Sequence, residues 1–145
     1  PLAYTRDGFN EYGDYIKHLN VEDRHFESAT SATSSMVLQT QYLVRFFRLV
    51  EMFAKRGIRV LISYPSLEES FFAASEAFIR ELDVALRAHK ALTVISSPED
   101  YAFPSDCFYD TGYHLNAKGR ELRTARLIRD LERYFQDTAG RGGGG

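Results

Sequence analysis

The sequence is poor in cysteine, proline and tryptophan, with one Cys, four Pro and no Trp in 145 residues. The lone Cys107 excludes an intrachain disulfide and any zinc site built from several cysteines. No apolar run approaches the roughly 18–20 residues of a membrane-spanning helix, because Arg45, Arg48 and Glu51 interrupt the longest apolar stretch. Lys and Arg total 18 against 20 Asp and Glu, and this near balance argues against binding of nucleic acid by bulk electrostatics. We therefore expect no membrane span in this chain and no nucleic-acid partner.

Hydrophobic residues make up 44% of the chain, including eleven Phe and nine Tyr, which is enough to bury the core of one compact domain. Residues 1–33 mix turn-forming and aromatic residues without a steady period, so we expect an irregular, aromatic-rich segment there. Five of the ten glycines lie at or after Gly140, which predicts a flexible tail over 138–145. Because the chain starts at Pro1 and lacks a leader pattern, we interpret it as part of a longer protein, with its folded portion over 34–137.

Three segments carry apolar side chains at the spacing of one helix face. The first spans about 34–56 and is followed by Gly57, which together with the two preceding cations is typical of a helix end. The second spans about 66–89, and we expect Ser66 to cap its start. The third spans about 117–135 and has a basic exposed face.

Two short, nearly continuous apolar runs, 58–64 and 92–96, are typical of strands buried on both faces of a parallel sheet. Helices alternate with these strands, which predicts an α/β fold of the flavodoxin-like, three-layer type. Such a sheet normally needs about five strands, so we expect the chain to hold mainly the C-terminal half of the fold.

Sites in open α/β sheets lie beyond the carboxyl ends of the strands, and the loop before the last helix, 107–119, holds the most informative residues. It contains Asp110 and His114 on either side of Gly112. Imidazole is the side chain best suited to move protons near neutral pH, and a nearby carboxylate orients it and stabilises its charged form. The sequence therefore predicts His114 as a general base that Asp110 orients.

The segment 113–119, YHLNAKG, resembles the last conserved block of the SGNH (GDSL-type) esterases and acyltransferases. The resemblance implies that His114 and Asp110 are catalytic, and it places Tyr113 and Asn116 where substrate binds. The order of elements before this block resembles bacterial members that act on acyl groups of the cell envelope or of exopolysaccharides. It thus implies an acyl-ester substrate, including esters of carbohydrates, and a location in the cell envelope or periplasm.

The chain departs from the family pattern in two ways. Three residues separate Asp110 from His114, where the commonest family spacing is two. No serine has a glycine within three residues before it, so the chain has neither a Gly-Asp-Ser nor a Gly-x-Ser-x-Gly nucleophile motif. We expect the serine nucleophile and the oxyanion donors to lie upstream, and this chain alone to have little or no esterase activity.

Structural roles remain open for the same residues. His114 could donate to a backbone carbonyl, Asp110 could cap the turn before Gly112, and Asn116 is our preferred N-cap for the last helix. Cys107 could act as a nucleophile with His114, although a packed thiol is more common at such a position.

A different class of function is also open, namely a non-catalytic module that binds a polysaccharide or a protein partner. The aromatic residues before residue 20 and the basic helix face would supply the contacts. Missing strands would leave an open sheet edge, which makes a homo-oligomer a further prediction. A metal site from Asp106, Asp110 and His114 matches no strong ligand spacing, and no cofactor is expected.

Overall fold

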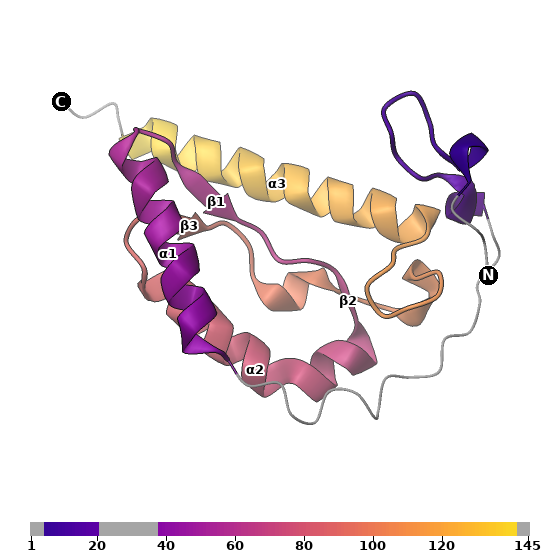
Figure 1. Ribbon diagram of the computed structural model, residues 1–145, viewed down its shortest axis with the longest axis horizontal. Coiled ribbons are helices and arrows are strands. Elements are labelled where there is room, and N and C mark those ends of the chain that lie inside the picture. The colour runs from indigo at the N-terminus through magenta and orange to yellow at the C-terminus, as the bar shows by residue number, and fades with distance from the viewer. Residues whose placement is uncertain (1–4, 21–37, 142–145) are drawn as a thin grey trace.

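A computed structural model describes residues 5–20 and 38–141 of the chain (Figure 1). The described part is mixed α/β, with three long helices and four short strands. The helices are α1 (Thr40–Lys55), α2 (Glu69–Ala88) and α3 (Ala117–Arg141), and the strands are β1 (Val60–Ile62), β2 (Leu67–Glu68), β3 (Leu92–Val94) and β4 (Ala102–Phe103). Single 3-10 turns cover Arg6–Gly8, Lys17–Asn20, Pro98–Tyr101 and Ser105–Cys107.

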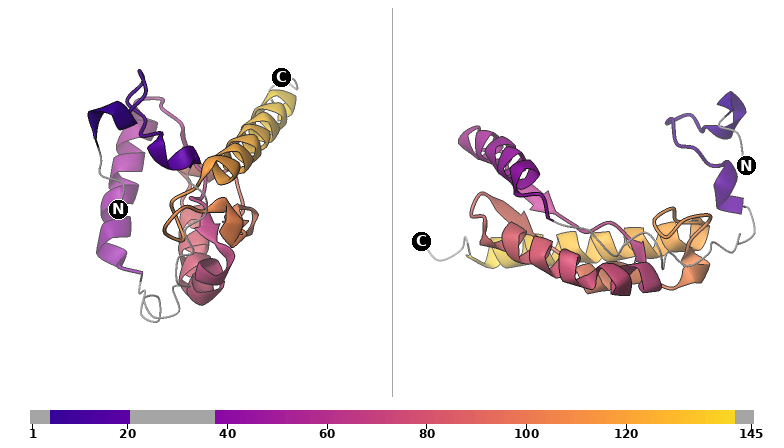
Figure 2. Two further views of the ribbon diagram at one scale, coloured as in Figure 1. Left: turned by 90° about the vertical axis from the view of Figure 1, so that its right-hand side faces the viewer. Right: turned by 60° about the horizontal axis from the view of Figure 1, so that its bottom comes forward.

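The strands form two small parallel sheets, one from β1 and β3 and the other from β2 and β4. Within the described residues these pairs do not join into one larger sheet. The predicted alternation of helices with parallel strands is therefore confirmed, whereas the flavodoxin-like three-layer sheet stays a prediction. The helices α2 and α3 run lengthwise on either side of the strands, and α1 covers β1 at one end (Figures 1 and 2).

The helix bounds differ from the predicted ones at three ends. The first helix was expected from about 34, but α1 begins at Thr40, and Leu38 and Gln39 before it are not helical. The start of α2 is capped by Glu68, whose carboxylate accepts hydrogen bonds from the backbone N–H groups of Ser70 and Phe71 at 2.9 and 3.1 Å. The predicted cap, Ser66, was wrong because β2 draws the two residues after it into a sheet and delays the helix. At the other end, α3 continues to Arg141 and so includes the first residues of the segment predicted to be a flexible tail.

Other predicted bounds lie partly outside the described residues. This applies to 34–37, where we expected the first helix to begin, and to 1–4, 21–33 and 142–145. The end of α1 agrees with its prediction, because Gly57 has a φ of 72° that favours glycine. Residues 5–20, the amino-terminal segment hereafter, form two 3-10 turns and an antiparallel bridge between Phe9 and Tyr15.

The larger core lies where α1 and α2 pack against β1 and β3. Two of its tyrosines keep their hydroxyl groups bonded inside the protein, since Tyr64 donates to Asp83 at 2.6 Å and Tyr101 donates to Asp130 at 2.9 Å. Burial and the Asp83 carboxylate raise the pKa of Tyr64 well above its usual range, so the hydroxyl stays a donor. The buried members of this larger core are Val50, Tyr64, Leu86, Leu92 and Tyr101.

A smaller core supports the loop before α3. Phe103, Cys107 and Phe108 are completely buried in it, with Leu115 packed against them. Burial raises the pKa of the Cys107 thiol, which agrees with a packed thiol and opposes a nucleophilic thiolate. The first turn of α3 passes so close that a Cβ on Gly119 would lie 2.2 Å from the Cys107 carbonyl oxygen.

We expect Gly119→Ala to lower the free energy of unfolding by about 2–3 kcal/mol, because the added methyl group meets backbone that cannot move aside easily. Gly140→Ala is the matched control, since a Cβ there has open space and the exchange within a helix should be neutral or stabilise by up to about 1 kcal/mol. Urea unfolding followed by circular dichroism measures both. Equal stability of the two variants would contradict the close approach.

Candidate functional site

The candidate site is the loop between the last 3-10 turn and α3. An antiparallel bridge between Phe108 and Leu115 closes the loop, and the Tyr109 N–H donates to the His114 carbonyl at 2.8 Å. Its tip is held to the start of α2, because the Glu68 N–H donates to the Gly112 carbonyl at 2.8 Å. The loop is therefore fixed both to itself and to a helix end.

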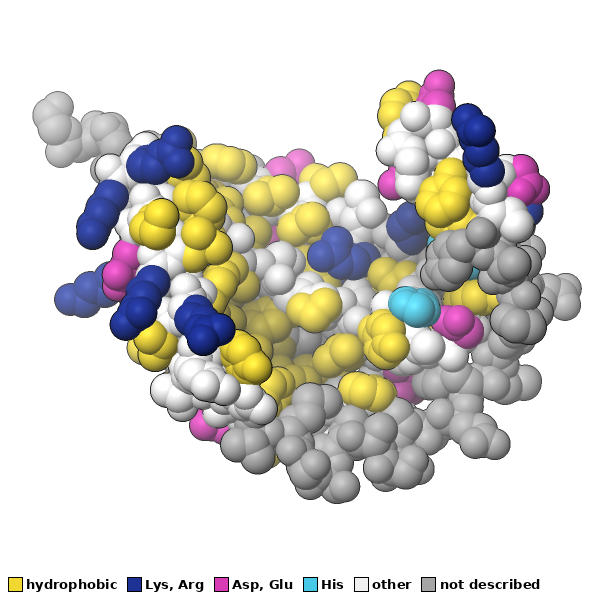
Figure 3. Space-filling view, in the orientation of Figure 1, with side chains coloured by type: hydrophobic (Ala, Val, Ile, Leu, Met, Phe, Trp, Pro, Cys, Tyr) yellow, Lys and Arg dark blue, Asp and Glu magenta, His cyan; other side chains and the backbone are white. Residues whose placement is uncertain are grey.

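The structure brings Asp110 and His114 into direct contact, with 2.8 Å between the carboxylate Oδ1 and the imidazole Nδ1. Both side chains are about half exposed, at 44% and 49%. An ionised carboxylate can only accept, so this contact favours the imidazole tautomer with its hydrogen on Nδ1, and in that tautomer Nε2 has the free lone pair. Figure 3 shows a histidine beside an acidic side chain at the edge of a hollow that hydrophobic side chains line.

The turn between these two residues is closed without the Asp110 carboxylate. The backbone N–H of His114 donates to the carbonyl of Thr111 at 3.3 Å and to its hydroxyl oxygen at 3.1 Å. Thr111 thus fills the turn-capping role that we had considered for Asp110. The Asp110 carboxylate is left to bond the imidazole.

Asn116 caps α3, as we preferred. Its Oδ1 accepts from the Gly119 N–H at 3.0 Å, and its Nδ2 donates to the carbonyls of Asp106 at 2.8 Å and Phe108 at 3.3 Å. This amide ties the start of α3 to the loop, and its role in substrate binding stays a prediction. Tyr113 is 57% exposed, and its ring lies edge-on to the His114 ring with 4.7 Å between centroids.

Sequence reasoning missed His18, which the amino-terminal segment brings to the site. Its ring stacks on Tyr15 with 5.6 Å between centroids and lies 5.8 Å from the ring of Tyr109. Burial lowers the pKa of His18, as do positive charges on His114 and Arg120, while Asp110 opposes them. His18 lies in the 3-10 turn Lys17–Asn20 and Tyr15 lies just before it, but this local spacing carries no sign of the contact with Tyr109.

Asp106, the remaining residue of the metal site considered from the sequence, already has a partner. Asp106 forms an ion pair with Lys118, and the hydrogen bond from that ammonium group holds the pKa of Asp106 below its usual range. Across residues 5–20 and 38–141, no group of three or more His, Cys, Asp or Glu side chains is placed to hold a metal ion. In the same part of the chain, no helix has the length and apolar character needed to cross a membrane.

Comparisons of the chain with protein-family models, with curated proteins and with solved structures found no match.

Replacing Asn116 tests its structural role. We expect Asn116→Ala to lower the free energy of unfolding by about 1–2 kcal/mol, because α3 loses its cap and two carbonyls lose a donor. Asn116→Asp keeps an oxygen that can accept from Gly119 and should recover part of this loss. Thermal unfolding of the parent and the two variants measures their order of stability. An alanine variant as stable as the parent would contradict the capping role of Asn116.

The pKa of His18 predicts a pH dependence of the contact between the amino-terminal segment and the site. The folded pKa lies below the ordinary 6.5, so the unfolded state binds the proton more tightly. The contribution of neutral His18 to the free energy of unfolding is therefore complete above pH 6.5, and it is lost as the pH falls through the lower pKa of the folded state. Ring NMR titration should find the low pKa in the folded protein, and His114→Gln should raise it by removing a neighbouring cation. A His18 pKa at or above 6.5 would refute this placement.

Proposed function

We propose that Asp110 and His114 form the general-base half of an SGNH-type site for ester chemistry, an esterase or an O-acyltransferase. The observation that carries the proposal is the 2.8 Å contact between Asp110 and Nδ1, which leaves Nε2 of a half-exposed imidazole free to accept a proton. The resemblance of the segment 113–119 to the SGNH block supports the same assignment.

In the proposed reaction a serine hydroxyl attacks the carbonyl carbon of an acyl ester. His114 takes the serine proton at Nε2 and delivers it to the leaving alkoxide, and Asp110 stabilises the imidazolium that forms in between. The acyl group is then on the serine. Its transfer to water gives hydrolysis, whereas its transfer to a sugar hydroxyl gives an acylated carbohydrate. The chain contains no Gly-Asp-Ser motif, so the proposal assigns it the base and its orienting group but not the nucleophile.

The fold and the location follow from the same proposal. The two parallel strand pairs would belong to a flavodoxin-like three-layer sheet, with the candidate loop at the carboxyl ends of its strands. Acyl groups on cell-envelope or exopolysaccharide chains are the substrates that the resemblance favours, which would place the protein in the envelope or periplasm.

A binding module is the second candidate, and exposed aromatic side chains in the amino-terminal segment favour it. Tyr12 is 82% exposed and Phe9 is 43% exposed. Aromatic rings that face solvent can stack on sugar faces or insert into a partner protein. In this case His114 and Asp110 serve only to hold the loop.

An ester assay with active-site labelling separates the candidates. We expect the complete gene product to turn over an activated acetyl ester and to react with a fluorophosphonate at one serine. His114→Gln should lower kcat/KM by about 10²–10⁴-fold and abolish labelling, because the serine loses its base. His89→Gln is the matched control, since His89 stacks on Phe47 in the larger core's neighbourhood, away from the loop.

Peptide mapping identifies the labelled serine. We expect the 145-residue chain alone to remain unlabelled. Turnover that survives His114→Gln would refute the proposed role of the imidazole. Retained polysaccharide binding by that variant, without any ester turnover in the parent, would establish the binding module instead.

A further inference from the structure

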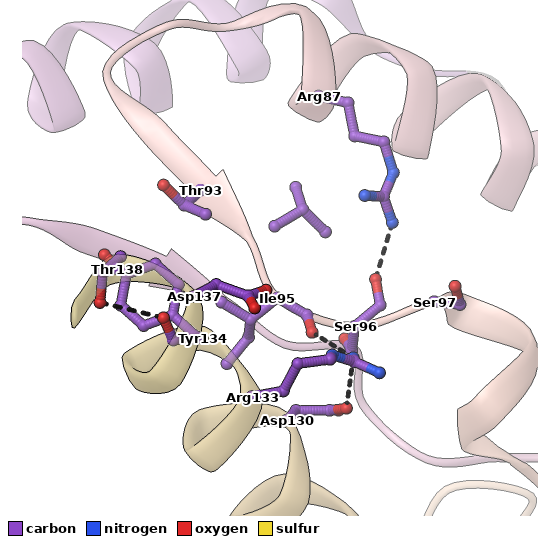
Figure 4. Close-up of a pocket in the computed structure, with 11 residues that line it drawn as sticks. Arg87, Thr93, Ile95, Ser96, Ser97, Asp130, Arg133, Tyr134, Asp137 and Thr138 are labelled. Carbon is purple, nitrogen blue, oxygen red and sulfur yellow. Dashed lines mark hydrogen bonds and ion pairs between the residues drawn. The ribbon is translucent and has the colours of Figure 1, made fainter. Parts of the chain in front are cut away.

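A cavity of about 570 Å³ beside β3 is lined largely by polar and charged side chains (Figure 4). Arg87 donates to the Ser96 carbonyl at 2.7 Å, and Arg133 donates to the Ile95 carbonyl at 3.1 Å. Each arginine also forms an ion pair with a carboxylate of its own helix. These two cations are therefore already bonded within the protein, and they do not mark a site for an anionic ligand.

A second cavity, of about 230 Å³, has the opposite kind of lining. It lies between α2 and the chain that leads from β1 to α2, and its walls are almost entirely hydrocarbon. Among the described residues, no charged side chain lines it. One face of α2 supplies most of the wall through Phe71, Phe72, Ser75, Phe78, Ile79 and Leu82. An apolar ligand gains most from such a cavity, because binding removes its surface from water.

Ser75 distinguishes this apolar cavity from ordinary core packing. It is 4% exposed, and its hydroxyl forms no hydrogen bond with any described residue. Tyr64 also lines the cavity, but its hydroxyl donates to Asp83 at 2.6 Å. Folded proteins ordinarily fill internal space with larger side chains and bond nearly all of their buried hydroxyl groups. A small, unbonded residue in the wall therefore leaves room that the core itself does not use.

The apolar cavity adjoins the loop that carries Asp110 and His114. A Cβ on Gly112 would lie 3.2 Å from Cδ2 of Phe71, so the backbone at the tip of the loop packs directly on a ring that lines the cavity. Gly112 precedes His114 by only two residues. The cavity is thus next to the site proposed for ester chemistry, and an acyl chain is the hydrocarbon that an ester substrate brings there.

We propose that the apolar cavity binds the hydrocarbon chain of an acyl group, with the carbonyl end of that group toward the loop of His114. At the roughly 30 Å³ that a water molecule takes in the liquid, the cavity has room for a chain of about eight non-hydrogen atoms. A medium-length acyl chain therefore fits, whereas an acetyl group leaves most of the space empty. The choice of an acyl group rests on the proposed ester chemistry, but the binding of an aliphatic chain does not.

NMR titration of the 145-residue chain with acetate, hexanoate, octanoate and decanoate tests the cavity without any ester turnover. We expect the affinity to rise about three- to fourfold for each added methylene, because each one leaves water for an apolar wall. The rise should stop near eight carbons, when the cavity is full. The ring signals of Phe72 and the methyl signals of Ile79 should shift on binding.

Two variants that occupy the cavity make the test specific. Ser75→Leu places a larger side chain in it, and Phe72→Trp narrows it from a partly exposed position in case the first variant does not fold. Either should lower the octanoate affinity by at least about tenfold, because most of the chain loses its apolar contacts. Ala77→Leu is the matched control, since it adds bulk to α2 at an exposed position outside the lining and should keep the affinity within about twofold. Circular dichroism confirms folding.

The complete gene product supplies a second readout. Its kcat/KM should be higher for an octanoyl than for an acetyl ester, and Ser75→Leu should cancel this preference. Octanoate binding that depends on chain length, in a protein without ester turnover, would refute the ester chemistry but support the cavity as a site for an aliphatic chain. An octanoate affinity no higher than that of acetate would overturn the proposal, as would an equal loss of affinity in Ser75→Leu and Ala77→Leu.

Discussion

The close approach of α3 to the Cys107 carbonyl is the constraint on which the candidate site depends. A glycine at position 119 lets the first helical turn reach a backbone oxygen that a Cβ would approach to 2.2 Å. The Gly119 N–H is then free to bond the side chain of Asn116, whose amide reaches back to the loop carbonyls. One missing side chain thus allows the helix, the smaller core and the loop to meet, and the position of His114 follows from their meeting.

Elsewhere in the molecule, charged side chains of α2 and α3 hold the helices against the strands and loops. Asp130 of α3 accepts from the buried Tyr101 hydroxyl, and Arg133 one turn later bonds the Ile95 carbonyl. On the opposite side, Asp83 of α2 accepts from Tyr64 while it also binds Arg87. These bonds fix both helices against strands only two or three residues long, which could not hold the helices by sheet pairing alone.

The elements that the sequence predicted correctly have patterns that extend over many residues. The apolar stripe before Gly57 and the stripe inside 66–89 each fix a helix face, and two β-branched runs fix β1 and β3. The strands β2 and β4 span two residues each, too short for any period, and β2 moved the cap of α2 from Ser66 to Glu68. His18 escaped prediction because its contact with Tyr109 joins residues ninety-one positions apart in the sequence, and such packing leaves no local pattern.

The candidate dyad shows how a departure in spacing is reconciled with a close contact. Three residues between a carboxylate and an imidazole leave a complete turn to be closed, and an aspartate at its start would ordinarily bond the turn itself. Here the Thr111 hydroxyl accepts from the His114 backbone, and Gly112 lies against the Phe71 side chain with little room to spare. Because the turn is satisfied by its second residue and anchored by its third, the Asp110 carboxylate reaches Nδ1 at 2.8 Å. The longer spacing is therefore compatible with the orientation that a general base requires.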